Sequence, residues 1–383
     1  MKRTKVCIIA LIVLMLVCEN HSIVSAGNES SVVNHVSTGI VDIELSEYQI
    51  KDGKEVKWQD NPLVLPGTNV SKIPRIHNYG NDCYVRAKVS FRDIVVNLEK
   101  NIYGMGNDWV KKNDGYYYYT KILRTEESVD LFRGILIPPD FPQTLEGRTF
   151  YLDLSVDAIQ SQNFTPDFSA ALPWGSVKIV QCDKQGPYNV TSFEPGENKM
   201  FLIEYQGESE ELFLNEEDFF QNFSVLMPGD EYKDSVEIRN SSESDVNLYF
   251  RSEIAEENLS EEIELLITTE VNGQERMLYK GPLKAESLSE NRLLVNIPGG
   301  VQGKLNYTVT VPEELGNTYA AEECQVKWIF STEPGVRKTQ TVRTGDSRNV
   351  EILLLLAVFS LVSIVVIVVK RKRHCEKNSR YDC

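Results

Sequence analysis

Residues 65–91 read LPGTNVSKIPRIHNYGNDCYVRAKVSF, and this stretch decides the fold of the chain. A Pro-Gly turn begins it, and toward its end Val85, Ala87, Val89 and Phe91 alternate with other side chains. Successive side chains of a strand point to opposite faces, so a period of two is typical of a strand with one buried face. The turn residues 79–81 lie before that strand. The stretch therefore predicts β-strands joined by tight turns.

The same alternation recurs along most of the chain. Apolar residues occupy every second position at 41–45, 150–156, 201–205, 236–238 and 305–311. Helical periodicity is confined to short segments near 126–132 and 259–266. The chain of 383 residues is 42% hydrophobic and 25% charged, which are ordinary globular values and exclude a mostly disordered chain. The sequence predicts an all-β protein.

The pattern occurs twice. A strand at 41–45 or 201–205 is followed by Pro66-Gly67 or Pro228-Gly229, and then, twelve residues after the proline, by Asn78 or Asn240. An apolar residue before a glycine (132–134 and 279–281) and a long alternating strand (150–156 and 305–311) complete each copy. We interpret the copies as two tandem antiparallel β-sandwich domains at 37–183 and 187–334, preceded by a polar segment at 27–36.

A family resemblance accompanies this repeat. The stretches VDIELSEYQ (41–49) and 65–91 resemble the TasA/camelysin family of exported bacterial surface proteins, as do GNDWVKKNDGYYYYTKIL (106–123), SVDAIQSQNF (155–164) and LMPGDEYKDSVEIRN (226–240). The likeness covers most of 37–334. It implies jelly-roll-like sandwiches and secretion by a Gram-positive bacterium. Some members assemble into biofilm matrix fibres, and camelysin itself is classed as a metallopeptidase.

The two ends of the chain predict its location. Residues 1–26 are typical of a secretory signal peptide, with a basic start, an apolar stretch and cleavage between Ala26 and Gly27. Cys18 would allow a lipoprotein signal instead, although Val17 before it disfavours one. Residues 352–369 are eighteen residues without a charge, long enough for a transmembrane helix across a thin bilayer. The basic tail 370–383 follows and is expected in the cytoplasm, which places the bulk of the chain outside.

A second resemblance lies in the linker 335–351. Its segment VRTGD (342–346), followed by an apolar span and basic residues, is similar to a degenerate sortase-type cell-wall sorting signal. Only Thr344 and Gly345 of the usual LPxTG pentapeptide are present. The resemblance implies that a sortase cuts between them and joins the protein to the cell wall. Retention as a single-span membrane protein is the alternative.

Few residues suit catalysis or cofactor binding. A zinc peptidase needs three ligands, but no H-E-x-x-H occurs and the exported part has only His35 and His77. No G-x-S-x-G motif or Gly-rich phosphate loop is present, and the acidic run at 208–218 is typical of a solvated hairpin face. We expect no catalytic residue, no metal site and no cofactor.

Three further features leave alternatives open. Of the exported cysteines, Cys83 and Cys182 could form a disulfide, although buried free thiols fit at least as well. Alternation in Tyr116–Tyr119 predicts two rings inside and two outside, where they could stack on sugars. Asn-x-Ser/Thr sequences suggest a rival, a glycosylated receptor ectodomain, and occur at Asn28, Asn69, Asn163, Asn189, Asn222, Asn240, Asn258 and Asn306.

The net charge of the chain restricts the classes of molecule that it is expected to bind. The net charge of −16 divides into +2 for residues 1–26, +4 for 370–383 and hence −22 for 27–369. Such an acidic exported part does not suit nucleic acid. The expected partners are the membrane, signal peptidase, sortase, and another copy of the chain or a homologous fibre protein.

We therefore predict a non-catalytic structural or adhesive protein of a bacterial cell membrane or cell wall. By the family resemblance, its N-terminal segment 27–39 inserts as a donor strand into a neighbouring molecule, so that the protein builds or anchors matrix fibres. The alternatives are a camelysin-like metallopeptidase and a carbohydrate- or protein-binding module.

Overall fold

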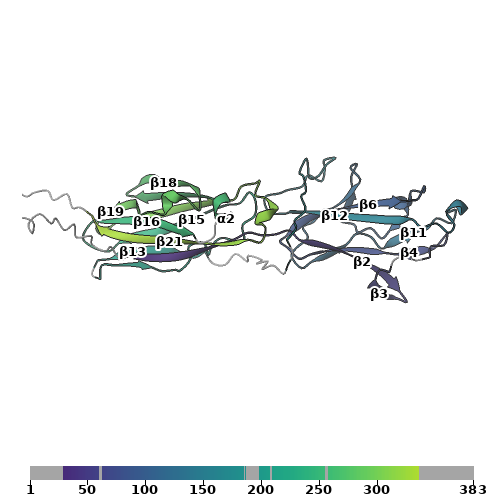
Figure 1. Ribbon diagram of the computed structural model, residues 1–383, viewed down its shortest axis with the longest axis horizontal. Coiled ribbons are helices and arrows are strands. Elements are labelled where there is room, and N and C mark those ends of the chain that lie inside the picture. The colour runs from purple at the N-terminus through teal and green to yellow at the C-terminus, as the bar shows by residue number, and fades with distance from the viewer. Residues whose placement is uncertain are drawn as a thin grey trace, which may run out of the picture. The chain divides into compact units, whose positions relative to one another are not determined.

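The structure is a computed structural model that describes residues 29–59, 63–184, 186, 198–207, 209–254 and 258–335. The predicted signal peptide, transmembrane helix and basic tail lie outside these residues, as do Ala26, Gly27, Thr344 and Gly345. Within the described ranges, no helix is both long enough and apolar enough to cross a membrane. The fold is all-β, as predicted, with strands arranged in several sheets (Figure 1).

Three sheets lie within residues 43–160, with strand orders β10-β5-β2-β3, β4-β11-β7 and β12-β6-β9-β8. Their strands are β2 (Ile43–Lys51), β3 (Lys54–Lys57), β4 (Asn69–Ser71), β5 (Ile73–Asn78), β6 (Cys83–Arg92), β7 (Ile102–Tyr103), β8 (Trp109–Lys111), β9 (Tyr116–Tyr119), β10 (Ser128–Asp130), β11 (Gly134–Leu136) and β12 (Tyr151–Gln160). Two 3-10 turns, η1 (Leu98–Asn101) and η2 (Gln143–Leu145), connect them. We call this part the first half.

Two sheets make up the second half, with strand orders β1-β21-β16-β19 and β14-β13-β15-β20-β17-β18. Their elements are β1 (Glu29–Ser37), β13 (Phe201–Gln206), β14 (Glu211–Leu214), β15 (Glu231–Asn240), β16 (Val246–Ile254), α2 (Asn258–Glu262), β17 (Glu264–Val271), β18 (Gln274–Pro282), η3 (Glu286–Leu288), β19 (Arg292–Ile297), β20 (Gln302–Thr310), η4 (Asn317–Tyr319) and β21 (Glu323–Pro334).

Each half has its own core. In the second half the two sheets meet face to face, and the rings of Tyr307 on β20 and Trp328 on β21 lie edge to face at 5.3 Å. In the first half, residues of β5, β6, β8 and β9 form a separate core around Phe132, and a smaller cluster surrounds Leu98. Aromatic pairs of this kind add to the area that the sheets bury. The second half is thus a β-sandwich-like pair of sheets.

The Pro-Gly and Asn residues of the repeat have equivalent roles in both halves. The N–H of Gly67 donates to the carbonyl of Ile137, and the N–H of Gly229 donates to that of Val311. Both glycines have a positive φ (+78° and +87°), which glycine adopts at little cost. The buried amides of Asn78 and Asn240 each donate to two backbone carbonyls, on Asn81 and Leu123 in one half and on Ser244 and Ile297 in the other.

Two details of the predicted repeat are wrong. The stretch 150–156 lies mainly in β12, which pairs with β6, whereas 305–311 lies mainly in β20, which pairs with β15. When strands of the two halves are matched by the strands they pair with, β12 of the first half corresponds to β21 of the second. Strand β20 of the second half corresponds to β10 and β11 of the first. The glycines of 132–134 and 279–281 do not correspond either, because the first begins β11 and the second lies in β18. Alternation shows which face a residue takes but not which strand lies beside it.

One strand pair corrects the prediction of purely antiparallel sheets. Strand β13 runs parallel to β15 over five residue pairs, from Phe201–Val236 to Tyr205–Asn240. The hairpin partner β14 reverses the chain before β15 begins, so β13 and β15 start at the same end of the sheet.

Candidate strand-exchange site

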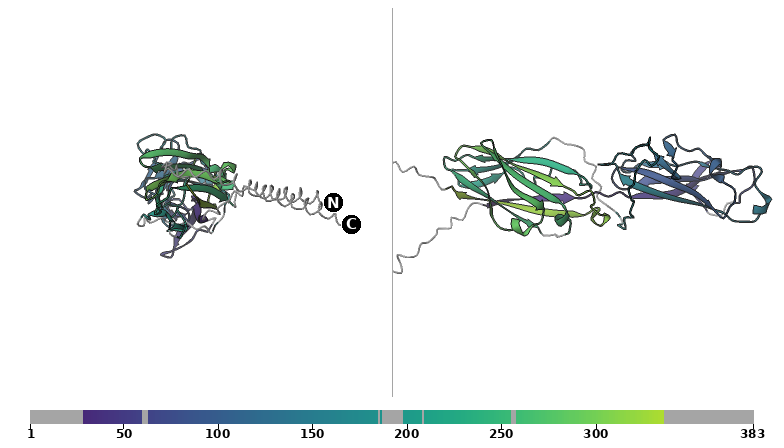
Figure 2. Two further views of the ribbon diagram at one scale, coloured as in Figure 1. Left: turned by 90° about the vertical axis from the view of Figure 1, so that its left-hand side faces the viewer. Right: turned by 90° about the horizontal axis from the view of Figure 1, so that it is seen from above.

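The N-terminal strand β1 belongs to the second half of the molecule, although the whole first half follows it in the sequence. It pairs with β21 in antiparallel register along all nine of its residues, from Glu29–Ser331 to Ser37–Glu323. The purple strand beside yellow-green β21 in Figures 1 and 2 is β1. Residues 29–36 of the segment that the sequence set apart as 27–36 therefore form a strand of a sandwich-like half in this chain.

Alternate side chains anchor β1 in the core. Val32, Asn34 and Val36 are 1%, 0% and 4% exposed, while Ser31 and His35, which point to the opposite face, are exposed. Val32 and Val36 lie in the same core as Trp328 and Phe250. Removing β1 would uncover this apolar surface, so the second half depends on a strand of distant sequence origin.

The other edge of β1 is occupied as well. The Ser30 hydroxyl donates to the Leu212 carbonyl at 2.6 Å, and the Val33 N–H donates to the Glu217 carbonyl at 2.8 Å. The N–H of His35 donates to the Asp218 carboxylate at 3.3 Å. Strand β1 thus fills a slot between β21 and residues 212–218, and its backbone is hydrogen-bonded on both sides.

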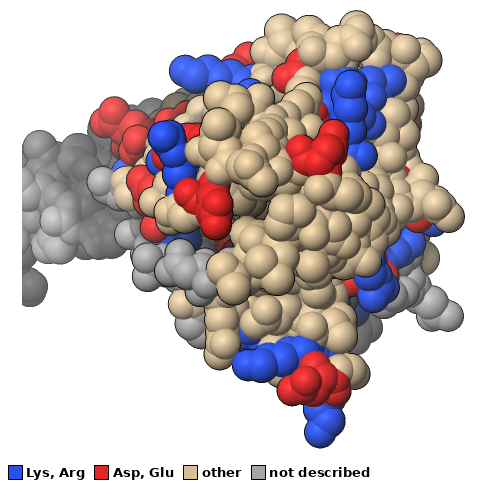
Figure 3. All heavy atoms as spheres, turned by 90° about the vertical axis from the view of Figure 1, so that its right-hand side faces the viewer, with Lys and Arg blue, Asp and Glu red and all other residues tan. Residues whose placement is uncertain are grey.

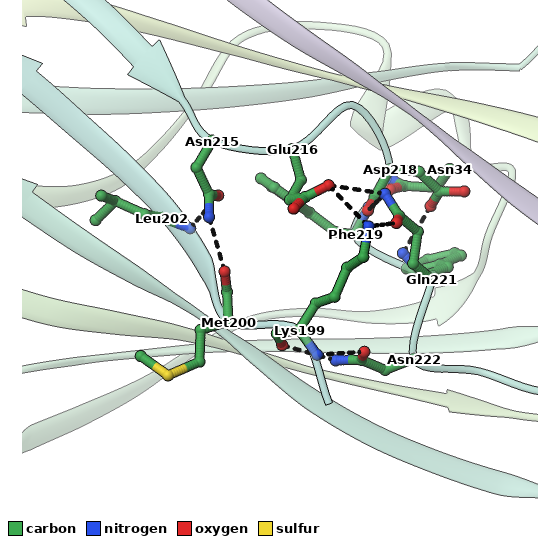
Figure 4. A network of polar contacts seen from close by, with 11 residues as sticks. Asn34, Lys199, Met200, Leu202, Asn215, Glu216, Asp218, Phe219, Gln221 and Asn222 are labelled. Atoms are coloured by element: carbon green, nitrogen blue, oxygen red, sulfur yellow. Dashed lines mark hydrogen bonds and ion pairs between the residues drawn. The ribbon is translucent and has the colours of Figure 1, made fainter. Parts of the chain in front are cut away.

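Side chains fix the loop that closes the slot (Figure 4). The N–H of Phe219 donates to the Asn34 side-chain oxygen at 2.8 Å, and the N–H of Phe220 donates to Asp218 at 2.7 Å. Lys199 pairs with Glu216 at 3.2 Å, next to Asn222. Glu216 and Asp218 of the acidic run, which the sequence assigned to a solvated face, therefore shape this loop.

The two ends of β1 are held by polar contacts. Glu29 accepts two hydrogen bonds from Arg251, at 2.8 and 3.0 Å. These hydrogen bonds are the main reason why the pKa of Glu29 is lowered and that of Arg251 is raised. At the far end, the Thr38 N–H donates to the Glu322 carbonyl at 2.9 Å and the Glu322 N–H donates to the Thr38 hydroxyl at 3.0 Å.

Three buried polar atoms next to the slot have no hydrogen-bond partner among the described residues: Asn34 Nδ2, Trp328 Nε1 and Ser252 Oγ. Ser252 is opposite Trp328, and Trp328 is opposite Val32, so the three lie on adjacent strands. A buried polar group without a partner costs about 1–3 kcal/mol. Of the three, only Asn34 belongs to β1, and the burial of its Nδ2 opposes part of the gain from the apolar contacts of this strand.

Acid is expected to loosen β1 through Glu29. Because the pKa of Glu29 in the folded protein is below its ordinary value of 4.5, its contribution to stability is present above that pH and is lost as the pH falls through the folded pKa. Amide hydrogen exchange of 29–37, relative to that of β16, should therefore be faster at pH 4 than at pH 6 after correction for intrinsic rates. Glu29→Gln should reduce this pH dependence, and an equal dependence in both proteins would contradict the assignment.

The tyrosine run is covered on both sides. Tyr117 and Tyr119 pack in the core of the first half, as two inward rings should. On the opposite face, Tyr118 is only 1% exposed, and the Arg86 guanidinium lies 4.1 Å from the Tyr116 ring centroid. Arg86 also lies 4.7 Å from the ring of buried Trp174. The outward rings therefore do not form an open platform for sugars.

Among the described residues, no three His, Cys, Asp or Glu side chains form a group that could hold a metal ion. His77 contacts Ser128 at 2.8 Å, and His35 contacts Asp218 at 3.0 Å.

The disulfide considered between Cys83 and Cys182 is not formed, because neither of these two described cysteines is part of a disulfide. Cys83 is enclosed in the core of the first half, where burial raises the pKa of its thiol to about 12. The thiol of Cys182 lies instead near the carbonyl of Asn317, at 4.0 Å.

Three of the potential glycosylation sequences use their asparagine inside the fold. The side-chain amides of Asn163, Asn222 and Asn240 donate to Asp230, Asp234 and the Ile297 carbonyl at 2.6, 2.6 and 2.9 Å. A glycan on that nitrogen would break these hydrogen bonds. These three sequences therefore give no support to the receptor alternative.

No family model and no curated protein matches the chain. Among solved structures, the CupB6 tip adhesin from Pseudomonas aeruginosa is 7% identical, with 78% of this chain and 94% of that chain covered and a TM-score of 0.15. Infectious bursal disease virus, Gt strain, is 11% identical, with 83% and 74% covered and a TM-score of 0.17. Scores this low leave the function to be argued from the chain itself.

Proposed function

We propose that the protein is a non-catalytic structural or adhesive protein of a Gram-positive cell surface, built from two jelly-roll-like sandwich domains, that joins its copies by exchange of strand β1. The observation that carries this proposal is the position of β1 in the slot of the second half. It agrees with the role that the family resemblance suggests for residues 27–39.

The topology favours exchange. Residues 38–42 lead from β1 directly into the first half, and the chain returns to the second half only after residue 184. A strand from another copy would find the same nine partner residues on β21 and the same loop at 212–218. Such a swap keeps the contacts of β1 with β21 and with residues 212–218, and a swap that does not close on itself produces a filament.

The predicted features at the two ends of the chain suggest that such an assembly is attached to the cell surface. A signal peptide, a span at 352–369 and a sorting-like motif at Thr344-Gly345 would export the protein and keep it at the membrane or wall. A tethered copy would then anchor, seed or cap a fibre.

The first half offers an uncharged surface for adhesion. Figure 3 shows a face on which Lys, Arg, Asp and Glu are sparse compared with the uncharged surface between them. Apolar residues of the first half are strongly exposed, with Val95 at 88% and Leu63 at 87%. These side chains are accessible for contact with another molecule.

A designed disulfide tests the exchange. His35 and Gln325 are opposite each other and both exposed. The His35 N–H donates to Asp218 rather than to β21, so this is a non-hydrogen-bonded pair with close side chains. Oxidised His35→Cys/Gln325→Cys protein should give an internal disulfide in monomers and disulfide-linked ladders in assemblies, on non-reducing gels.

The natural protein and His35→Cys alone serve as controls, since none of the described native cysteines is part of a disulfide. If electron microscopy shows filaments whose oxidised subunits carry only internal disulfides, strand exchange is wrong and assembly uses another surface. If the protein stays monomeric at high concentration with residues 27–39 intact, the structural role itself is contradicted.

A further inference from the structure

A cavity of about 230 Å³ lies in the second half between the edge strands β18 and β19. These strands are at the opposite end of their sheets from β1 and β14, so the cavity is separate from the strand-exchange slot. The residues that line it are Phe250, Ile267, Arg276, Leu278, Tyr279, Leu288, Arg292, Leu293 and Leu294. Seven of the nine are aliphatic or aromatic, and the two arginines and the tyrosine hydroxyl add polar surface to the lining.

Each of the two edge strands has a bulge-like register shift at this place. Ile267 pairs with Tyr279 and Thr268 pairs with Met277, which leaves Leu278 of β18 without an opposite residue. Leu248 pairs with Val295 and Tyr249 pairs with Leu293, which leaves Leu294 of β19 in the same situation. Both extra residues line the cavity. A bulge re-aims side chains and often marks a functional site, and here one occurs on each side.

The charged residues that line the cavity are both basic. Arg276 and Arg292 line it and are exposed, and no described residue forms an ion pair or hydrogen bond with either guanidinium. No carboxylate is among the lining residues. Elsewhere in the same half Arg239 pairs with Glu237 and Arg251 with Glu29, as expected in so acidic a chain. Two guanidinium groups without acidic partners leave their donors available to an anion.

We propose that this cavity binds a small organic carboxylate, with its single apolar group inside and its carboxylate between Arg276 and Arg292. Guanidinium groups match carboxylates in charge and in geometry. The volume suits one group the size of a large side chain. This site is independent of the proposed strand exchange.

The probe is 3-phenylpropionate, with neutral 3-phenylpropionamide as its uncharged counterpart. Ligand-observed NMR on the purified full-length chain in detergent, with detergent alone as the blank, measures both affinities. The acid should bind at least about tenfold more tightly than the amide, because only the acid forms charge-assisted hydrogen bonds. Equal binding of the two, or no binding of the acid at millimolar concentration, would overturn the proposal.

Variants locate the site. Arg276→Gln and Arg292→Gln should each weaken acid binding about tenfold and leave amide binding unchanged. Leu278→Trp should fill the cavity and reduce binding of both probes. Arg148→Gln, an exposed arginine of the first half, is the matched control and should bind like the natural protein. Unchanged acid binding in both cavity-arginine variants, with unchanged melting temperatures, would place the ligand elsewhere and refute the assignment.

Discussion

Val32→Asp is expected to expel β1 from its slot and to destabilise the second half by about 3–5 kcal/mol, the range observed when a buried charge has no partner. Val32 is 1% exposed and packs in the core that contains Trp328. A domain has only about 5–15 kcal/mol of net stability, so the loss should appear as a separate, much lower unfolding transition in calorimetry. The first half should keep its own transition, because its core is separate.

Val33→Asp is the matched control. Val33 is the next residue of the same strand, points to the other face and is only partly buried, so the same substitution should cost much less. Similar losses in both variants would mean that burial of the Val32 side chain does not hold β1.

A peptide supplies the complementary test. Synthetic residues 27–39, added in excess to the Val32→Asp protein, should restore the lost transition by occupying the slot. The same peptide carrying Val32→Asp should not restore it. Failure of the natural peptide would show that the slot does not accept a strand in trans, which is the central step of the proposed assembly.

Asn240→Asp is expected to produce the second large effect, again about 3–5 kcal/mol and confined to the second half. The Asn240 amide is 0% exposed and donates to the carbonyls of Ser244 and Ile297. A carboxylate of the same shape has no N–H to donate and places a negative charge against both carbonyl oxygens. Thermal unfolding followed by calorimetry measures the loss.

Asn78→Asp should do the same to the first half, where Asn78 donates to the carbonyls of Asn81 and Leu123. Asn113→Asp, at an exposed turn, makes the same chemical change without burial and should have little effect. If both buried variants lower one common transition equally, the two halves unfold as a single unit and their separate cores do not make them independent.

The sequence contains only a weak indication of the strand-exchange site. Val32 and Val36 are four residues apart in a polar segment, and the structure places both in the core of the second half. The residues that receive β1, such as Trp328, Arg251 and Asp218, carry no local signal that connects them to the N-terminus. Likewise, Phe250, Arg276 and Arg292 come from three different strands, and only the fold brings all three to one cavity.

The sequence by itself determined the all-β class and the repeated spacing of Asn78 and Asn240 from their Pro-Gly turns, because alternation and turn chemistry act within a few residues. Only the tertiary structure decided that β1 completes the second half, that β13 runs parallel to β15, and that the extra residues of two register shifts line one cavity beside β19. The physical reason is that strand pairing is non-local. Every strand edge presents the same N–H and C=O groups, so packing of the side chains in the assembled core selects the partner.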